Sequence, residues 1–396
     1  MTLLDDLTVV EMTVHRAGPF CGSVLADMGA DVVKVERPGA GDPSRVQGPG
    51  PEGKSAYFSA LNRNKRSVTL DMKSEAGTEA AMDLLADADV FVENFGYGVA
   101  ERLGVGYDDV KEVNEDIVYA SVKGYGKTGP LREKPGLDLI LQAEGGIMSV
   151  TGPEGGDPVK VGQAIGDITA GMFAAIGVLA RLHERDREDV EATGGQFDVS
   201  LFDAIVSLMN EYLTIYGETG EVPGPQGTSH QTMIPYQLFE TADGSVVTGV
   251  PGDDRWDDFV DAVGCEEIRE YATNYEREEH REEVVSALEA AFEERTTEYW
   301  LDRLTEYGFP NGPLNDVGDI VDHDHARARN LVVDYEDDDW GDHVLPGFPV
   351  HFPDRETGIR SPAPRLGEHT AEVFEGVAAD QTTLDQWRDG GAFGDD

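Results

Sequence analysis

The segment LTVVEMTVHRAGPFCGSVLADMGADVVKVE, residues 7–36, decides the fold. Residues 7–12 are an apolar run typical of a buried strand, residues 13–19 read as a loop, residues 20–28 as a helix, and residues 31–36 as a second buried strand. A strand, a helix and a further strand in this order predict a βαβ unit with parallel strands and a right-handed crossover. The opening of the chain therefore predicts an α/β fold.

The same alternation continues to residue 122. Further strands are expected at 67–71, 90–93 and 117–122, and further helices at 74–86, 99–103 and 107–114. Open parallel sheets bind ligands at the carboxyl ends of their strands. Those ends are basic or Gly-rich here, which favours an anionic ligand; they carry Arg37, Asp71 to Lys73, Asn94 to Gly96, and Lys123 to Gly126.

The first strand-to-helix turn lacks the dinucleotide-binding fingerprint. It reads His15-Arg-Ala-Gly-Pro-Phe20, without the G-x-G-x-x-G glycines that let a backbone approach a pyrophosphate. Glu36 stands where an acid could bind a ribose, but without those glycines NAD is not expected.

A second notable stretch runs from Val159 to Arg181 and places Asp167 at the N-terminal end of an apolar, Ala- and Gly-rich helix. Taken alone, Asp167 is best explained as an N-cap, because Asp oxygens accept bonds from the free N–H groups of a first helical turn. Small residues such as Gly171 and Ala174 would let a backbone or ligand approach closely. A helix over 137–150 precedes this stretch, and an apolar helix over 197–215 follows it after a short strand.

The domain organisation follows from changes in composition. Residues 1–216 form the N-terminal part of a large domain, 217–235 are a Gly/Pro/Thr linker, and 236–324 read as a smaller α+β domain that opens with a hairpin. Residues 325–396 return to the large domain. Residues 39–66 read as a long loop, and the acidic tail from Asp385 is expected to fray.

Charge is the extreme feature of the composition. The chain has 396 residues with 78 acidic and 31 basic side chains, a net charge of −47. This excludes nucleic acid, which calls for a basic surface, and favours an acid-coated protein from a halophile's cytoplasm. With two cysteines, no basic–apolar leader and no uninterrupted apolar run of about 18 residues, we expect no disulfides, signal peptide or membrane span.

The chain resembles the class III CoA-transferases, a family that includes formyl-CoA transferase, carnitine CoA-transferases and α-methylacyl-CoA racemases. The resemblance spans nearly the whole chain, and its pieces occur in order. They are Ala17 to Cys21, Ala30 to Pro38, Asn62 to Lys73, Val92 to Phe95, Glu101 to Gly104, Ala120 to Tyr125, Gly166-Asp167, Gly308 to Asn315 and Pro364 to Thr370.

The resemblance implies a ring-like monomer with a Rossmann-like large domain, built from N- and C-terminal parts, and a small domain. Two such rings would interlock as a homodimer. Asp167 matches the nucleophilic aspartate, and CoA or acyl-CoA would be the substrate, without a tightly bound cofactor or metal. The positions implied to contact CoA are His15, Arg16, Ala17, Arg37, Leu70, Asp71, Met72, Lys73, Asn94, Phe95, Gly96, Arg102, Lys123 and Asp138.

Some positions depart from the family pattern. Formyl-CoA transferase has a lysine and a tyrosine where this chain has Pro135 and Leu137, so those contacts do not carry over. Racemases have a His before an Asp where this chain reads Gly136-Leu137-Asp138. Because α-proton exchange needs an acid and a base on opposite faces of the carbon, racemase is the weaker alternative. A non-catalytic acyl-CoA-binding relative is the other, and the intact Asp167 argues against it.

The predicted chemistry is CoA transfer between carboxylates through anhydride and aspartyl-CoA intermediates. A carboxylate with the ordinary pKa of about 3.9 is ionised at neutral pH and needs no separate base. N–H groups at the start of the Asp167 helix would hold oxyanions, and His15 and Arg16 could hold a free carboxylate of the substrate. From the resemblance and the expected habitat, the first substrate hypothesis is C1-to-C4 transfer within mesaconyl-CoA. Succinyl-CoA-dependent transfer to mesaconate or malate comes next.

Overall fold

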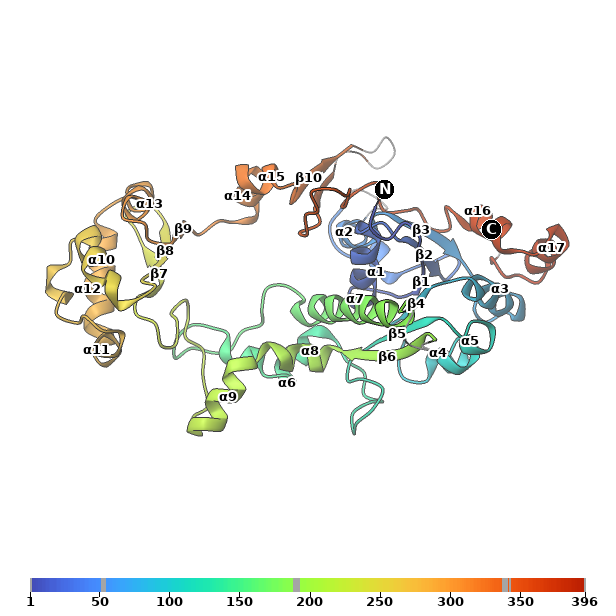
Figure 1. The fold of residues 1–396 in the computed structure, drawn as a ribbon, viewed down its shortest axis with the longest axis horizontal. Coiled ribbons are helices and arrows are strands. Elements are labelled where there is room, and N and C mark those ends of the chain that lie inside the picture. The colour runs from blue at the N-terminus through green and yellow to red at the C-terminus, as the bar shows by residue number, and fades with distance from the viewer. Residues whose placement is uncertain (1, 51–54, 188–192, 337–340, 342, 395–396) are drawn as a thin grey trace. The chain divides into compact units, whose positions relative to one another are not determined.

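The computed structural model describes residues 2–50, 55–187, 193–336, 341 and 343–394 (Figure 1). The chain divides into two compact units. Unit 1 comprises Met1–Ile147, Lys160–Thr219 and Asp324–Asp396, and unit 2 comprises Met148–Val159 and Gly220–His323. Unit 2 thus takes in most of the segment expected as a linker, together with a short segment from within the N-terminal part of the chain.

Unit 1 is built on a six-stranded parallel sheet with strand order β3-β2-β1-β4-β5-β6. This is the order of a doubly wound Rossmann-type sheet, so the predicted α/β fold with a parallel sheet is confirmed. The strands are β1 (Thr8–Met12), β2 (Asp31–Glu36), β3 (Lys65–Thr69), β4 (Val90–Glu93), β5 (Val118–Lys123) and β6 (Gly195–Ser200).

Residue alternation along the strands directs apolar side chains to both faces of the sheet. Val9 pairs in register with Val32 and Val90, and these three belong to one core cluster. The next residue, Val10, belongs to a second cluster on the other face. Because both faces are covered, the strands are nearly continuous apolar runs, as buried parallel strands usually are.

Two long helices cover the first face of the sheet, α1 (Ala17–Asp27) and α7 (Ile165–Arg185). They approach closely because α7 presents glycine there: a Cβ at Gly171 would lie 2.6 Å from the Ala17 carbonyl oxygen. By length and composition α7 is apolar enough to cross a membrane, a property that core helices of globular proteins share. In this fold its buried side packs on α1 and β5.

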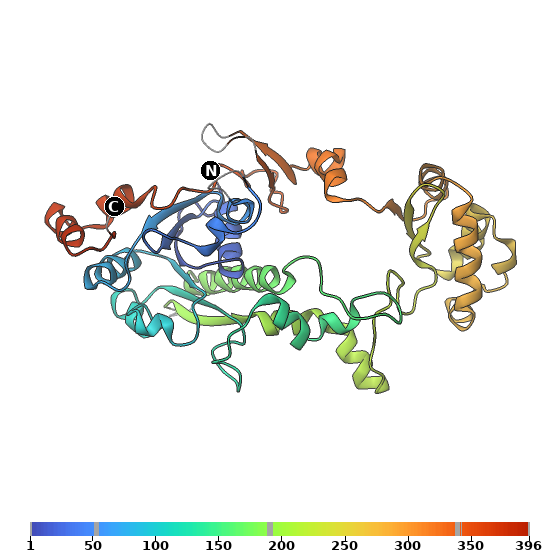
Figure 2. The same cartoon turned by 180° about the vertical axis from the view of Figure 1, so that it is seen from behind.

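The second face is covered by helices from both ends of the chain. Figures 1 and 2 both show the C-terminal helices beside α3, and the contacts agree. Leu384, Trp387 and Ala392 are buried there, and the Ala392 carbonyl accepts a bond from the Asp71 amide. The prediction of a frayed tail from Asp385 is therefore wrong for residues 385–394; residues 395–396 lie outside the described part. The helices on this face are α3 (Glu75–Ala86), α4 (Val99–Arg102), α5 (Tyr107–Val113), α16 (Thr370–Val377) and α17 (Gln381–Asp389).

Two other predicted segments are corrected. The expected helix 197–215 is in fact the end of β6, then α8 (Leu201–Leu208) and α9 (Asn210–Thr219), because Ser200 ends the strand and caps α8 by accepting from the Asp203 amide. The expected loop 39–66 contains a 3-10 turn (Pro43–Val46) and helix α2 (Ala56–Asn62). The helix expected over 137–150 is α6 (Asp138–Glu144) followed by a 3-10 turn (Ile147–Val150).

Unit 2 has its own core and an antiparallel sheet. The predicted hairpin is confirmed as β7 (Tyr236–Glu240) and β8 (Ser245–Gly249), and β9 (Asn311–Pro313) joins β8. Phe239 stacks on Phe292 at 4.5 Å between ring centroids, and the core also buries Trp256 and Trp300. The helices of unit 2 are α10 (Trp256–Val263), α11 (Asn274–Glu279), α12 (Arg281–Glu293), α13 (Thr297–Glu306) and α14 (Val317–Asp322).

The chain returns to unit 1 through α15 (Asp324–Ala328) and an antiparallel pair, β10 (Val332–Tyr335) and β11 (His343–Pro346). The segment that follows is tied to the start of β3. Asn64 accepts from the amides of Arg360 and Ser361, and the His369 amide bonds to the Ser67 carbonyl. The C-terminal segment therefore completes the β3 side of the sheet.

Candidate active site

The loop after β1 lies at the topological switch point of the sheet, between β1 and β4. Asn94, directly after β4, bridges this crevice with both atoms of its amide: Oδ1 accepts from the Val14 N–H at 2.9 Å and Nδ2 donates to the Val14 carbonyl at 2.8 Å. A switch point is where doubly wound sheets bind ligands. Asn94 was expected to contact CoA, and the structure shows it holding the backbone of the neighbouring loop.

A buried cluster of charged side chains holds the same loop through hydrogen bonds to its backbone. The Lys34 ammonium lies 3.3 Å from Glu11 and 3.1 Å from Asp42, and the Lys65 ammonium lies 2.9 Å from Glu11. Burial lowers the pKa of Lys65 to about 8, although Glu11 opposes the shift. Asp42 Oδ1 accepts from the His15 amide at 3.2 Å, and His15 has a left-handed backbone with φ of 64°. The cluster thereby fixes an unusual conformation at the first predicted site residue.

Asp167 is half-buried in the first turn of α7 and is not its cap. The N-cap residue is Ala164, which makes no side-chain capping bond. The cap is supplied by Asp138, at the start of α6, whose Oδ1 accepts from the amides of Gly166 at 2.8 Å and Asp167 at 3.3 Å. The helix-cap interpretation of Asp167 is thus wrong, and its carboxylate is left for another use.

Gln142 fixes Asp138 in this role. One turn further along α6, it donates to Asp138 Oδ2 at 2.7 Å and to the Gln163 carbonyl at 3.2 Å, and it accepts from the Val161 amide at 2.9 Å. The buried Gln142 therefore ties α6 to the segment that leads into α7. It was not among the predicted residues, although its i+4 spacing from Asp138 on a helix was a readable signal.

The surroundings of Asp167 change its acidity. Burial raises the pKa of the Asp167 carboxyl to about 7, the neighbouring Asp138 adds to the rise, and Arg16 opposes it. The expectation of an ordinary carboxylate pKa is therefore corrected. The two first-turn amides are also occupied by Asp138, so the expected oxyanion donors at this helix end are already bonded.

Arg16 lies in the loop between β1 and α1. Its guanidinium carbon sits 4.4 Å from the centroid of the Tyr57 ring, which comes from α2. Sequence reasoning missed Tyr57 because it falls in a segment predicted to be a loop. The next residue, Ala17, is buried at the start of α1 and contacts α7 through its carbonyl. Asp167, Asp138 and Arg16 thus form one electrostatic group drawn from three elements.

A cavity of about 230 Å³ opens at the carboxyl ends of β1 to β4. It gathers six of the predicted CoA-contacting residues, Arg37, Leu70, Asp71, Met72, Lys73 and Phe95. Glu36 also lines it, but Glu36 accepts from Arg45 at 2.7 Å and from Ser67 at 2.6 Å. Its carboxylate is therefore already bonded within the protein, in keeping with the expectation that it does not serve a ribose.

The remaining predicted residues lie at the margin of this cavity. Lys123 donates to Glu93 at 2.6 Å and to the Phe95 carbonyl at 2.8 Å, so its charge is paired within the sheet edge. Gly96 is exposed, and its carbonyl accepts the Val99 amide ahead of α4. Arg102, the last residue of α4, is exposed beside Leu103, which lines the cavity.

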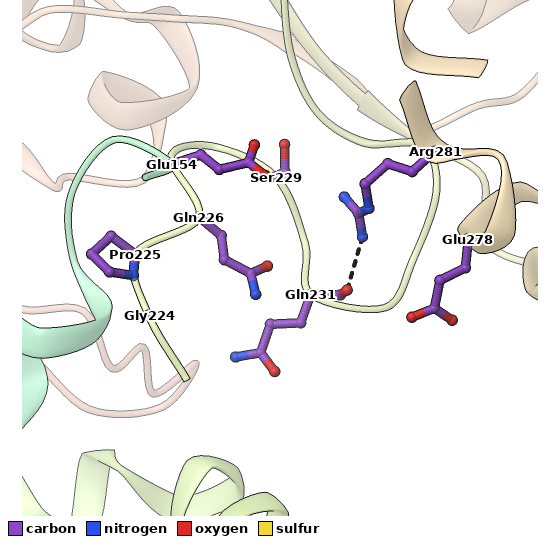
Figure 3. Close-up of a pocket in the computed structure, with 8 residues that line it drawn as sticks. All are labelled: Glu154, Gly224, Pro225, Gln226, Ser229, Gln231, Glu278 and Arg281. Carbon is purple, nitrogen blue, oxygen red and sulfur yellow. Dashed lines mark hydrogen bonds between the residues drawn. The ribbon is translucent and has the colours of Figure 1, made fainter. Parts of the chain in front are cut away.

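A separate pocket of about 260 Å³ lies within unit 2. Figure 3 shows the Arg281 side chain reaching across it to the Gln231 carbonyl, a bond of 2.8 Å. Two carboxylates, Glu154 and Glu278, share the lining and disfavour an acidic ligand. None of the predicted site residues lies here. The lining comprises Glu154, Gly224, Pro225, Gln226, Ser229, Gln231, Glu278 and Arg281.

The comparisons with known proteins agree with the geometry. Residues 4–370 match the model of CoA-transferase family III. Succinyl-CoA:mesaconate CoA-transferase of Haloarcula hispanica is 36% identical over 95% of this chain and 96% of its own length. Succinyl-CoA:glutarate CoA-transferase of Mus musculus is 34% identical over 95% of this chain and 87% of its own.

A solved structure shares the architecture. The crystal structure of a CAIB/BAIF family protein from Brucella suis superimposes with a TM-score of 0.85 and 34% identity, covering 95% of this chain and 100% of that one. The chain belongs to CoA-transferase family III. It is a class III CoA-transferase, and these relatives support a dicarboxylyl-CoA as its kind of substrate.

Proposed function

We propose that Asp167 is the nucleophile that moves CoA from one dicarboxylate to another. The observation that carries this proposal is the position of its carboxylate: half-buried, released from helix capping by Asp138, and within the electrostatic reach of Arg16. A carboxylate used neither as a cap nor in an ion pair among the described residues is free to attack a thioester carbonyl.

The first half of the reaction moves CoA onto the protein. The ionised Asp167 carboxylate attacks the thioester carbonyl, forming a mixed anhydride and releasing CoA as its thiolate. The thiolate attacks the Asp167 carbonyl of the anhydride and forms an aspartyl-CoA thioester. The donor acid leaves as a free carboxylate.

The second half reverses these steps with the acceptor. The acceptor carboxylate attacks the aspartyl thioester, which gives a second anhydride and releases the thiolate again. The thiolate then attacks the acceptor's carbonyl, which yields the new acyl-CoA and restores the Asp167 carboxylate. No group other than the two acids and CoA is consumed or formed.

CoA is proposed to lie along the carboxyl ends of β1 to β4. The 230 Å³ cavity there, with the cations Arg37 and Lys73 at its lining and Arg102 nearby, supports this placement. Guanidinium groups suit phosphates because they donate two parallel hydrogen bonds. Leu70, Met72 and Phe95 provide apolar contacts for the pantetheine chain.

For the particular substrate we propose mesaconyl-CoA, with transfer between its C1 and C4 carboxylates. Succinyl-CoA with mesaconate as acceptor is the second choice, supported by the Haloarcula relative. In the intramolecular case the released dicarboxylate attacks aspartyl-CoA with its other carboxylate. Racemisation is not proposed, because Leu137 stands where racemases carry their histidine.

We also propose a cytoplasmic homodimer, interlocked as the family resemblance implies. Unit 1 has apolar side chains without cover on α7, α6 and α9, which supports burial against a second copy: Met172, Phe173 and Ile176, Leu139 and Ile140, and Leu213 and Tyr216. The acidic surface supports a cytoplasm rich in salt.

Substitution of Asp167 tests the mechanism. Asp167→Ala and Asp167→Asn are expected to lose nearly all turnover, and the wild type is expected to form a hydroxylamine-sensitive adduct at Asp167 when given acyl-CoA. Near-normal turnover in either variant, or no adduct in the wild type, would contradict the proposal.

A panel of acyl-CoAs, with and without free carboxylic acids, identifies the substrate by mass spectrometry of the products. With mesaconyl-CoA alone, a C4 thioester is expected. A product that appears only after an acceptor acid is added would instead favour intermolecular transfer.

A further inference from the structure

Arg16 has the features of a binding group rather than a structural one. It is partly buried, and among the residues that the structure describes it forms no ion pair with a carboxylate. The nearby Arg45 and Arg63, by contrast, pair with Glu36 and Asp27. In a chain with 78 acidic residues, a partly buried arginine without such a pair leaves room for an anion from outside the chain.

The placement of Arg16 relates it to the acyl group and not to the phosphates of CoA. The next residue, Ala17, has its carbonyl oxygen against Gly171, one turn along α7 from Asp167, while the cavity proposed for CoA is lined by Arg37 and Lys73 and does not include Arg16. The Tyr57 ring, 4.4 Å from its guanidinium carbon, limits the orientations of the fork. A planar guanidinium held in this way matches a carboxylate with two parallel hydrogen bonds.

Resting on the proposed function, we propose that Arg16 binds the free carboxylate of the dicarboxylyl group whose other carboxylate reacts at Asp167. Arg16 is then the residue that selects dicarboxylates over monocarboxylates. Since donor and acceptor react in turn with the same nucleophile, Arg16 meets the free carboxylate of each. In an intramolecular transfer the dicarboxylate turns round, so that the group bound to Arg16 becomes the one that reacts.

Arg16 also acts on Asp167 itself, and the test has to separate the two effects. Loss of the guanidinium changes the nucleophile equally for every acyl-CoA, whereas loss of the carboxylate site affects only dicarboxylyl groups. The ratio of kcat/KM for a dicarboxylyl and a monocarboxylyl substrate therefore isolates the selection.

The experiment is identity exchange, in which acid and acyl group are the same: succinyl-CoA with labelled succinate, and butyryl-CoA with labelled butyrate. In Arg16→Gln the succinyl-to-butyryl ratio is expected to fall about 10- to 100-fold, the size of a lost charge-assisted hydrogen bond. Arg16→Lys keeps the charge without the fork and is expected to retain part of the ratio. Arg295→Gln, which removes an arginine beside a tyrosine in unit 2, is the matched control and should leave the ratio unchanged.

Two outcomes overturn the inference: an equal fall for both substrates, or an unchanged ratio in Arg16→Gln. If that variant does not fold, Tyr57→Leu takes its place, because it keeps Arg16 and removes the ring that orients it; an unchanged ratio there also overturns the inference. Absence of exchange and of an Asp167 adduct in the wild type marks failure of the proposed function itself, and the inference falls with it.

Discussion

Asp167 and Asp138 are neighbouring carboxylates in different environments. Asp138 accepts three hydrogen bonds, from two backbone amides and from Gln142, and so holds the start of α7. Within the described part of the chain, the Asp167 carboxylate accepts no such bonds; it is partly withdrawn from water and faces the charge of Asp138. The environment thus separates an anchored carboxylate from the one that we propose as the nucleophile.

The pH dependence of activity follows from this arrangement. If Asp167 is the nucleophile, as proposed, it reacts as its anion, so kcat/KM is expected to rise with pH through an apparent pKa near 7. Asp138→Asn keeps an oxygen that can cap α7 but removes the negative charge, and the midpoint should therefore move to lower pH. Because burial is the larger cause of the raised pKa, the midpoint in Asp138→Asn should remain above the ordinary pKa of an aspartate.

Asp138→Ala separates charge from capping. It removes both, so it should shift the midpoint as Asp138→Asn does and also lower the free energy of unfolding by about 0.5–2 kcal/mol. Steady-state rates from pH 5 to 9, with chemical denaturation of each variant, measure the two effects. A midpoint that stays in place in both variants would show that Asp138 does not influence the nucleophile.

The raised pKa of Asp167 also means that ionisation of this carboxyl lowers the free energy of unfolding. The folded pKa of about 7 lies above the unfolded value of 3.8, so the native state holds the extra proton and stability falls as pH rises between them. Asp167→Asn is expected to be more stable than the wild type by roughly 2–4 kcal/mol at pH 8. The difference should shrink toward pH 4, and urea unfolding across this range measures it. A constant difference would point to packing instead of ionisation.

At the scale of residues, the sequence pointed to Asp167 but not to its surroundings. The helix start, the small residues of α7 and the family pattern all marked the position. Its pKa depends on burial and on Asp138, which lies 29 positions earlier in the chain. Such a neighbour is created by tertiary packing, which periodicity within one helix does not reveal.

At the scale of elements, short apolar runs between turn signals were predicted well, whereas the expected loop 39–66 and the expected frayed tail were not. The bounds of β2 and β4 agree with those expected, because each begins and ends beside a clear change in polarity. The residues from Asp385, expected to fray, instead include the end of α17, whose Leu384 and Trp387 pack into the second core cluster. Two well-buried side chains outweigh the surrounding charge.

Deletion of α17 tests its structural role. A chain ending at Asp380 is expected to lose several kcal/mol of unfolding free energy, because it exposes the partners of a buried leucine and tryptophan and frees the Asp71 amide from Ala392. Thermal unfolding followed by circular dichroism measures the loss. The control is a chain ending at Gly394, which should unfold like the full chain, and equal stability of both truncations would refute the role.

At the scale of the whole molecule, charge dominates. With a net charge of −47, the compact state suffers strong self-repulsion that salt screens. The midpoint of thermal unfolding is therefore expected to rise by on the order of 10 °C when KCl is raised from about 0.1 M to 2 M. NaCl at equal ionic strength should act alike, since screening does not depend on the cation. A flat response to both salts would contradict this account.

The sequence also anticipated the large-scale plan. Alternating strands and helices predicted the parallel sheet, and the change in composition near residue 217 lies close to Gly220, where the longer segment of unit 2 begins. The segment Met148–Val159 was not anticipated as part of unit 2, because its association with residues beyond Gly220 is visible only in space, for example in the bond from the Gly227 amide to the Gly152 carbonyl.

The return of the C-terminal segment to β3 has a consequence for biosynthesis. The edge of the sheet is completed by bonds that involve Ser361, His369 and Ala392, which are synthesised after unit 2. Unit 2 is made mostly from one continuous stretch, so it has nearly all its contacts while unit 1 still lacks its final helices. We expect unit 2 to resist protease on stalled nascent chains once His323 has left the ribosome, and unit 1 to become resistant only when residues 361–392 have also emerged.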